Sequence, residues 1–324
     1  MKALLCKAFG PIDTLVVDEV PAPQPKAGEV LVRVRAAGVN FPDALIVQGL
    51  YQFKPQLPFA PGSEAAGEVL AVGPGVTRLT PGQRVVATTY WGAFAEQVVV
   101  PEHLAVPLPA AMPYEVGGAL LLVYGTCWHG LIDRGALAAG ETVLVLGAAG
   151  GIGLAAIEIA KARGARVIAA ASTADKLALA RAHGADATID YSTEDLRERL
   201  KVLTAGRGVD VVCDPVGGAL AEPALRSIAW RGRYLVIGFA AGEIPRIPLN
   251  LALLKGCAIV GVFWGEYLKR EPDGAARVVG ELFELYRAGA IRPHIAARYS
   301  LADGASAIAA VAGRQALGKL VIEP

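Results

Sequence analysis

One segment of the 324-residue sequence limits the possible folds more than any other. The apolar run from Thr142 to Leu146 leads into a glycine turn, Gly147 to Gly153, and residues 154–163 then have helical periodicity. Glycines let a backbone approach a pyrophosphate closely, and a helix N-terminus supplies free N–H groups with a partial positive charge. Glycine turns also serve packing alone, but the order strand, turn, helix is the one that a dinucleotide site requires. We therefore predict phosphate contacts from Gly150, Gly151, Ile152 and Gly153.

The rhythm of the sequence changes at about Thr142. Before it, residues alternate with period two, as in Glu29 to Ala36, and Pro-Gly pairs interrupt the runs, which predicts a β-rich, turn-rich domain. After it, apolar strands alternate with helical segments, a pattern typical of a parallel sheet covered on both faces. An amphipathic helix is expected after about Gly265. The final run, Lys319 to Ile322, predicts a strand that rejoins the first domain.

Composition excludes several classes of partner. The formal net charge is +1 with acids and bases interspersed, so neither nucleic acid nor an anionic membrane is an expected partner. The first residues resemble a strand rather than a targeting segment, and no apolar run is long enough to cross a bilayer, so we expect a soluble, cytoplasmic protein. The cysteines are far apart in apolar surroundings and are interpreted as reduced, buried thiols: Cys6, Cys127, Cys213 and Cys257.

The residues at the end of the strand after the glycine turn indicate whether a site binds NAD or NADP. An acidic side chain at its end would bind the ribose 2′-hydroxyl of NAD and repel the 2′-phosphate of NADP. This strand ends in Ala170 and Ala171, followed by Ser172, Thr173 and Lys176. A hydroxyl and an ammonium suit a phosphate, so we predict NADPH, bound by Ser172 and Lys176. The alternative is that Ser172 only caps the next helix and Lys176 is a solvated surface residue.

The glycine turn lies within a longer motif: Gly140-Glu141-x-x-Leu144, then Ala148-Ala149-Gly150-Gly151-x-Gly153, then Lys161. This motif resembles the signature of the quinone oxidoreductase branch of the medium-chain dehydrogenases. Glu158 departs from it, since the family usually has Gln there. The resemblance covers essentially the whole chain. Matching segments in the family's order and spacing are Ala37 to Asp43, Pro61 to Gly67, Val72 to Val76, Pro81 to Val85 and Gly92 to Glu96.

The resemblance implies an α/β fold with two domains and a cofactor cleft at their junction. A GroES-like, β-rich catalytic domain would comprise residues 1–122 and 266–324, and a Rossmann domain with a doubly wound parallel sheet residues 123–265. Near the nicotinamide and the acceptor, the implied catalytic residues are Asn40, Asp43 and Tyr51. The remaining implied cofactor contacts are Thr126 at the carboxamide, Tyr191 at the adenosine ribose, and Gly238, Phe239, Phe263 and Lys319 along the trough.

Simpler roles exist for several of these residues. Asp43 could only cap a helix, Phe239 and Phe263 could be core aromatics, and Tyr191 could be a loop residue packed on the sheet. Zinc is not expected, because zinc-dependent relatives carry Cys, His and Cys or an acid where this chain has Asn40, Ser63 and Leu122.

Without a metal, the expected reaction rests on orientation of the nicotinamide against an electron-poor carbon. We expect hydride transfer to a quinone, with Tyr51, Asn40 or an ordered water stabilising the oxygen that gains charge. Reduction of α,β-unsaturated ketones or thioesters is an alternative, and so is a non-enzymatic NADPH-binding role like that of the related lens crystallins. A homodimer is expected, because the apolar strand at Ala258 to Phe263 would otherwise leave an open sheet edge.

Overall fold

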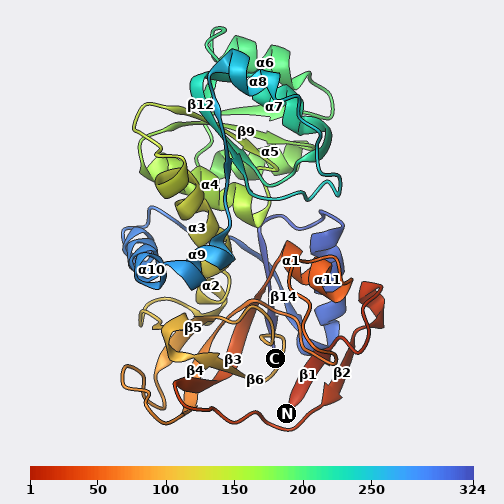
Figure 1. Cartoon of the computed structure of the whole chain (residues 1–324), viewed down its shortest axis with the longest axis vertical. Helices are drawn as coiled ribbons and strands as arrows, with labels where there is room; N and C mark the ends of the chain where they lie inside the picture. Colours follow the sequence, from red (N-terminus) through yellow and green to blue (C-terminus); the bar gives the residue numbers. More distant parts are fainter. The chain divides into compact units, whose positions relative to one another are not determined.

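The structure is a computed structural model that describes all 324 residues and divides into two compact units. The first unit contains residues 1–122 and 293–324, and the second contains residues 123–292. Figure 1 shows that strands and helices from both ends of the chain build the first unit.

The sheet of the first unit is built around β3 (Glu29–Val39). It has seven strands in the order β14-β15-β3-β4-β5-β7, and β6 also pairs with β3. The C-terminal β15 pairs antiparallel with β3 and so belongs to the first unit, which this strand was predicted to rejoin. The other strands are β4 (Glu64–Val72), β5 (Arg84–Thr88), β6 (Gln97–Pro101), β7 (Ala105–Pro107), β14 (Ile295–Ser300) and β15 (Lys319–Glu323), with a separate pair β1 (Lys2–Leu5) and β2 (Val16–Glu19).

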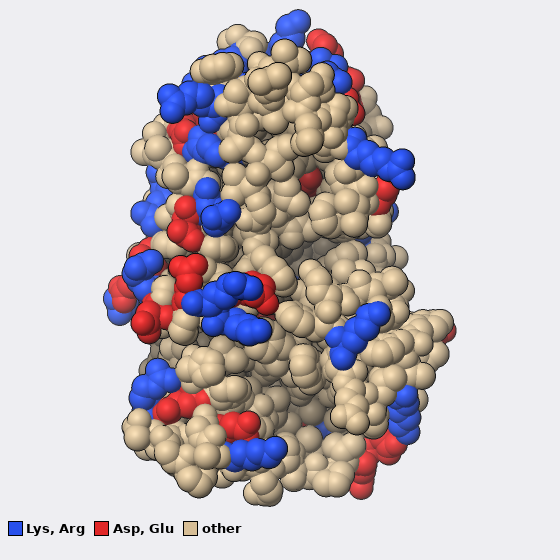
Figure 2. Space-filling model, viewed as in Figure 1, with Lys and Arg blue, Asp and Glu red and all other residues tan.

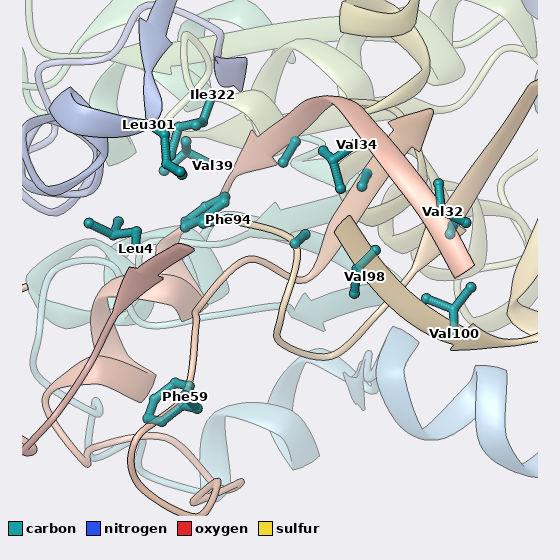
Figure 3. Close-up of a cluster of buried hydrophobic side chains, with 14 of the residues drawn as sticks. Leu4, Val32, Val34, Val39, Phe59, Phe94, Val98, Val100, Leu301 and Ile322 are labelled. Atoms are coloured by element: carbon teal, nitrogen blue, oxygen red, sulfur yellow. The ribbon is translucent and has the colours of Figure 1, made fainter. Parts of the chain in front are cut away.

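Side chains from both chain segments fill the core of this unit. Figure 3 shows Val39 of β3 close to Leu301 and Ile322 from the C-terminal segment, and Phe94 belongs to the same buried cluster. Burial of such apolar side chains contributes about 1.5–3 kcal/mol each, so the C-terminal segment is an integral part of this core. Three helices complete the unit: α1 (Phe41–Val47), α2 (Tyr114–Gly117) and α11 (Gly304–Ala312).

The second unit contains a six-stranded sheet in the order β10-β9-β8-β11-β12-β13, with every pairing parallel. This order reverses direction between β8 and β11, as in doubly wound dinucleotide-binding sheets. The predicted α/β fold is therefore confirmed. The strands are β8 (Thr142–Leu146), β9 (Arg166–Ala171), β10 (Ala187–Asp190), β11 (Val209–Asp214), β12 (Ile228–Val236) and β13 (Ala258–Gly261).

Helices connect and cover these strands. The chain enters the unit through α3, whose first residues Leu121 and Leu122 still belong to the first unit. The helices are α3 (Leu121–Trp128), α4 (Gly151–Ala162), α5 (Ala174–Ala182), α6 (Leu196–Leu203), α7 (Ala221–Arg226), α8 (Asn250–Lys255), α9 (Trp264–Arg270) and α10 (Pro272–Arg287).

One boundary differs from the sequence prediction. Residues 266–292 were assigned to the first domain, whereas the structure places them in the second unit. The reason is that α10 packs against α9 of the second unit. Its side chains Val278 and Leu282 are buried. In addition, Glu281 of α10 accepts a hydrogen bond from the indole of Trp128 at 3.1 Å.

No helix in the structure has both the length and the apolar composition needed to cross a membrane. On the face drawn in Figure 2, acidic and basic side chains are interspersed, with no extended area of one sign. This distribution agrees with the small net charge of +1.

Candidate active site

The first unit contains a buried ion pair that also binds Asn40. Lys319 begins β15, and its ammonium is 2.9 Å from Oε1 of Glu64, which begins β4. The Lys319 and Glu64 side chains are 4% and 0% exposed. Lys319 Nζ also donates to the carbonyl oxygen of Val39 at 3.0 Å and to Oδ1 of Asn40 at 2.5 Å.

These contacts give Lys319 a structural role. An ammonium has three N–H bonds, and here three acceptors of the same unit are within hydrogen-bonding distance. Lys319 therefore links β15 to β3 and β4, while its predicted place along the cofactor trough stays a prediction. The paired charges offset the large cost of burying either charge alone.

The side-chain amide of Asn40 takes part in the same hydrogen-bond network. Its amide nitrogen donates to Glu64 Oε1 at 2.9 Å and to the carbonyl oxygen of Gly38 at 3.1 Å, while its Oδ1 accepts from Lys319. An asparagine amide has two N–H bonds, so both are used. Asn40 therefore orients its neighbours, and the geometry leaves it no donor for an acceptor molecule.

Asp43 fixes the backbone around Asn40 and Gly62. It is the third residue of α1, and its carboxylate accepts from the backbone N–H of Asn40 at 2.8 Å and of Gly62 at 3.2 Å. The helix-capping role considered for Asp43 is therefore present. Burial raises the pKa of this carboxyl to about 7, although the two N–H groups and the Lys319 charge favour its ionised form.

Tyr51 follows α1 and belongs to a row of aromatic side chains. Its ring meets Phe53 edge-on with centroids 5.8 Å apart, and Phe53 meets Tyr90 in the same way at 6.0 Å. Burial, and secondarily the charge of Asp43, raise the pKa of the Tyr51 phenol above its usual value. This phenol is therefore protonated at neutral pH and can donate a hydrogen bond.

In the second unit, the glycine turn follows β8 and leads into α4. Gly150 is the N-cap of α4, and a side chain added there would meet little besides the Gly147 carbonyl oxygen at 3.5 Å. At Gly153, by contrast, an added Cβ would lie 2.5 Å from the backbone of Ala148. The turn thus combines a backbone open to a ligand with a tightly packed helix start, which is what phosphate binding requires.

Ser172 and Lys176 lie beside this turn in the sheet order, after β9. Lys176 Nζ is 3.4 Å from Ser172 Oγ. The residue that caps α5 is Thr173, whose hydroxyl accepts from the Lys176 backbone N–H, so the alternative that Ser172 is the cap is wrong. The hydroxyl and ammonium form a polar pair where Ala170 and Ala171 leave the strand end without an acid.

The remaining predicted cofactor residues of the second unit follow its other strands. Because the strands are parallel, the residues after their carboxyl ends share one edge of the sheet. Gly238 and Phe239 follow β12, and Phe239 lies within 2.9 Å of where a Gly217 Cβ would be, so it packs against the turn after β11. Tyr191 follows β10 and packs on the core, as considered for it, while Phe263 after β13 is 38% exposed and Thr126 of α3 is buried.

Two buried acids are part of this architecture but were not predicted as site residues. Glu64 accepts the backbone N–H of Leu122 at 2.9 Å besides its bonds to Asn40 and Lys319. Glu158 of α4 accepts from the Tyr124 hydroxyl at 2.7 Å and lies 2.7 Å from His183 Nδ1. Each stands in an otherwise apolar strand or helix, and a charged residue is rarely buried unless it is paired. That position in the sequence could have indicated a buried polar contact.

Two family models match the chain. One, described as the alcohol dehydrogenase GroES-like domain, matches residues 26–110, and one described as zinc-binding dehydrogenase matches residues 151–280. A quinone oxidoreductase of Pseudomonas aeruginosa is 38% identical over 100% of this chain and 99% of its own length. A quinone oxidoreductase-like protein 2 homolog of Nematostella vectensis is 38% identical over 99% of this chain and 88% of its own length.

The chain belongs to the quinone oxidoreductase-like branch of the medium-chain dehydrogenases. It is an oxidoreductase of that kind. A solved structure of the same branch, Escherichia coli quinone oxidoreductase complexed with NADPH, has a TM-score of 0.94 and 32% sequence identity, and the match covers 100% of both chains. The resemblance inferred from the motifs is therefore confirmed.

The donor set of this member does not fit zinc, despite the description of one family model. At the positions of the zinc ligands stand an amide, a hydroxyl and an alkyl side chain: Asn40, Ser63 and Leu122. Zinc prefers thiolate, imidazole and carboxylate ligands, and the neighbouring Lys319 ammonium would repel it. No group of three or more His, Cys, Asp or Glu side chains in the structure could hold a metal ion.

Proposed function

We propose that the chain is an NADPH-dependent reductase that passes a hydride to a small quinone. The observation that carries the cofactor choice is the polar pair of Ser172 and Lys176 beside the glycine turn, at a strand end without an acid. A charge-assisted contact of this kind favours a 2′-phosphate. Binding of NADPH by the E. coli relative supports the same choice.

The residues fit this cofactor. The first N–H groups of α4, from Gly150 to Gly153, would bind the pyrophosphate at the positive end of the helix dipole. Ser172 and Lys176 would hold the 2′-phosphate, and Tyr191 would lie by the adenosine ribose. Bound NADPH supplies a hydride from its nicotinamide. Thr126, Gly238, Phe239 and Phe263 would line the remaining length of the site.

In the first unit, Tyr51 is the residue that we assign to the acceptor. Its phenol is protonated at neutral pH, so it can donate to the oxygen that gains charge as the acceptor is reduced. The aromatic row with Phe53 and Tyr90 provides flat, apolar surface that suits a quinone ring. Asn40 and Asp43 are assigned to positioning, because their polar atoms already bind the protein.

A single screen tests this proposal. Oxidation of NADPH is followed by its absorbance with a panel of quinones and a parallel panel of enones. We expect quinone turnover, which the names of the relatives favour. Turnover of enones alone would assign the alternative activity. A protein that binds NADPH and reduces neither panel would contradict the proposal and favour the non-enzymatic role.

We further propose that the protein acts on its small-molecule acceptor in the cytoplasm. The support is that Cys6, Cys127, Cys213 and Cys257 are all free thiols, with the first three buried. Free thiols are typical of a reducing compartment. Fractionation of cells producing the protein, with thiol titration of the purified chain, tests this assignment.

A further inference from the structure

Ser63 carries a buried hydroxyl that has no hydrogen-bond partner. The residue is 7% exposed and immediately precedes Glu64 at the start of β4. A buried polar group without a partner costs about 1–3 kcal/mol, so proteins retain few of them without a functional reason. Among the buried polar side-chain atoms without a partner, Ser63 Oγ is the only hydroxyl.

The backbone around this hydroxyl is held firmly. The Ser63 carbonyl oxygen accepts from the Thr89 N–H at 2.9 Å, and the Gly62 N–H donates to Asp43. The Thr89 hydroxyl donates to the Gly62 carbonyl oxygen at 2.8 Å. Gly62 has φ +95° with Phe94 packed against it, a conformation and space that admit only glycine. The Ser63 side chain is thus carried on a backbone that is fixed on both sides.

The neighbouring polar side chains leave no other donor. Lys319 has three acceptors, and both amide N–H bonds of Asn40 are used. Glu64 accepts from these two residues and from Leu122, and has no donor of its own when ionised. Ser63 precedes Glu64 in the chain, and its hydroxyl hydrogen is not used by any of these bonds.

We propose that Ser63 donates a hydrogen bond to the carbonyl oxygen of the acceptor, a quinone or an enone. This inference rests on the proposed function. Hydride adds to the electron-poor carbon of the conjugated system, and the displaced π electron pair moves onto the carbonyl oxygen. NADPH is oxidised to NADP⁺ and the acceptor is reduced by two electrons. Ser63 stabilises the resulting oxyanion and keeps its own proton, while water protonates that oxygen and so gives the enol. With a quinone, the carbon that received the hydride then releases a proton to water and the second carbonyl oxygen takes one up, which gives the hydroquinone. A fixed donor without a competing partner is well suited to this role, because it needs no reorganisation when charge appears.

The test compares Ser63→Ala with Ser63→Thr, which keeps a hydroxyl. For Ser63→Ala we expect kcat/KM for a quinone to fall about 100- to 1000-fold, the range for loss of one such donor. The Kd for NADPH, from fluorescence titration, should be unchanged. Ser63→Thr should recover most of the lost turnover. Calorimetric binding of the quinone to the NADP⁺-loaded protein should be weakened by Ser63→Ala, which gives a readout without turnover.

Thermal unfolding separates this role from a structural one. Removal of a hydroxyl without a partner should leave Tm unchanged or raise it by up to about 2 °C, because a buried unsatisfied group is eliminated. Thr89→Val is the matched control, since it removes a hydroxyl that is hydrogen-bonded on the adjacent strand segment, and it should lower Tm.

Three outcomes would overturn the inference. Quinone turnover by Ser63→Ala equal to that of wild type would remove Ser63 from acceptor binding. A loss of Tm as large as that of Thr89→Val would assign the hydroxyl a structural role. Wild-type protein that binds NADPH but neither binds nor reduces any quinone or enone would contradict the proposed function itself, and this inference with it.

Discussion

At the scale of single residues, the carboxyl group of Asp43 has an environment that opposes its ionisation. It is buried, and Glu64 adds a second negative charge nearby, while Lys319 and two backbone N–H groups act in the opposite direction. The pKa is about 7 in the folded protein, against 3.8 for an ordinary Asp. Between these values the folded state binds a proton that the unfolded chain has released, so stability falls as pH rises through this window.

The substitution Asp43→Asn should remove this pH dependence. Wild type loses up to roughly 4 kcal/mol from this group between about pH 4 and pH 7, whereas the variant, which cannot ionise, does not. The Tm of Asp43→Asn minus the Tm of wild type should therefore rise from pH 5 to pH 7 and be level from pH 8 to pH 9. A difference that is constant across the whole range would show that Asp43 ionises normally.

The pair of Glu64 and Lys319 predicts strong coupling between two substitutions. Lys319→Met leaves the Glu64 carboxylate buried without a counter-charge and should cost about 3–5 kcal/mol of unfolding free energy. Adding Glu64→Gln removes the second charge and should recover at least about 2 kcal/mol of that loss. Denaturant unfolding of wild type, both single variants and the double variant measures the coupling. Strictly additive effects would mean that the two charges do not depend on each other.

This pair also shows why the sequence predicted only part of the site. Lys319 and Glu64 are 255 residues apart in the chain. The sequence around each one indicates only a charged residue at the start of a strand. Nothing local indicates that β15 and β4 bring them together through β3. The motifs therefore drew attention to individual residues, Asn40 and Lys319 among them, while the partner that each polar atom binds required the tertiary structure.

At the scale of elements, local signals were sufficient where backbone geometry decides the structure. The glycine turn, β8 and α4 follow from the glycines and from the switch between strand and helix periodicity. The domain assignment of α10 was wrong, because an amphipathic pattern shows that one face must be buried but not against which unit. The contacts of α10 with α9 and the hydrogen bond between Glu281 and Trp128 answer that question.

The junction of β9 and α5 predicts cofactor preference. Lys176→Ala removes the ammonium beside Ser172 and should weaken NADPH binding roughly tenfold to a hundredfold, since a charge-assisted phosphate contact contributes about 1.5–3 kcal/mol. NADH, which has no 2′-phosphate, should be affected little. Fluorescence titration with both cofactors measures the two Kd values, and Lys201→Ala on the exposed face of α6 serves as the control. Equal weakening of both cofactors would reject the assignment.

At the scale of the whole molecule, the six-stranded sheet of the second unit ends at β13, which pairs only with β12. An unpaired strand edge is a template for association, and proteins usually cover it. Here the edge is accompanied by exposed apolar side chains from β13 and from the elements around it. They are Ile259 at 42% exposed, Trp230 at 72%, Leu249 at 77%, Leu253 at 79% and Leu254 at 69%.

These features support the proposed homodimer, in which β13 of two copies would pair antiparallel about a twofold axis and the apolar side chains would be buried together. Light scattering at micromolar concentration should give twice the chain mass of 33.5 kDa. Ile259→Lys combined with Leu253→Glu places charges in the contact and should yield the monomer. Val202→Lys, at an equally exposed position on α6, which packs near the opposite end of the sheet at β10, should leave the dimer intact. A wild-type protein that stays monomeric, or a double variant that still dimerises, would show that β13 is not the interface.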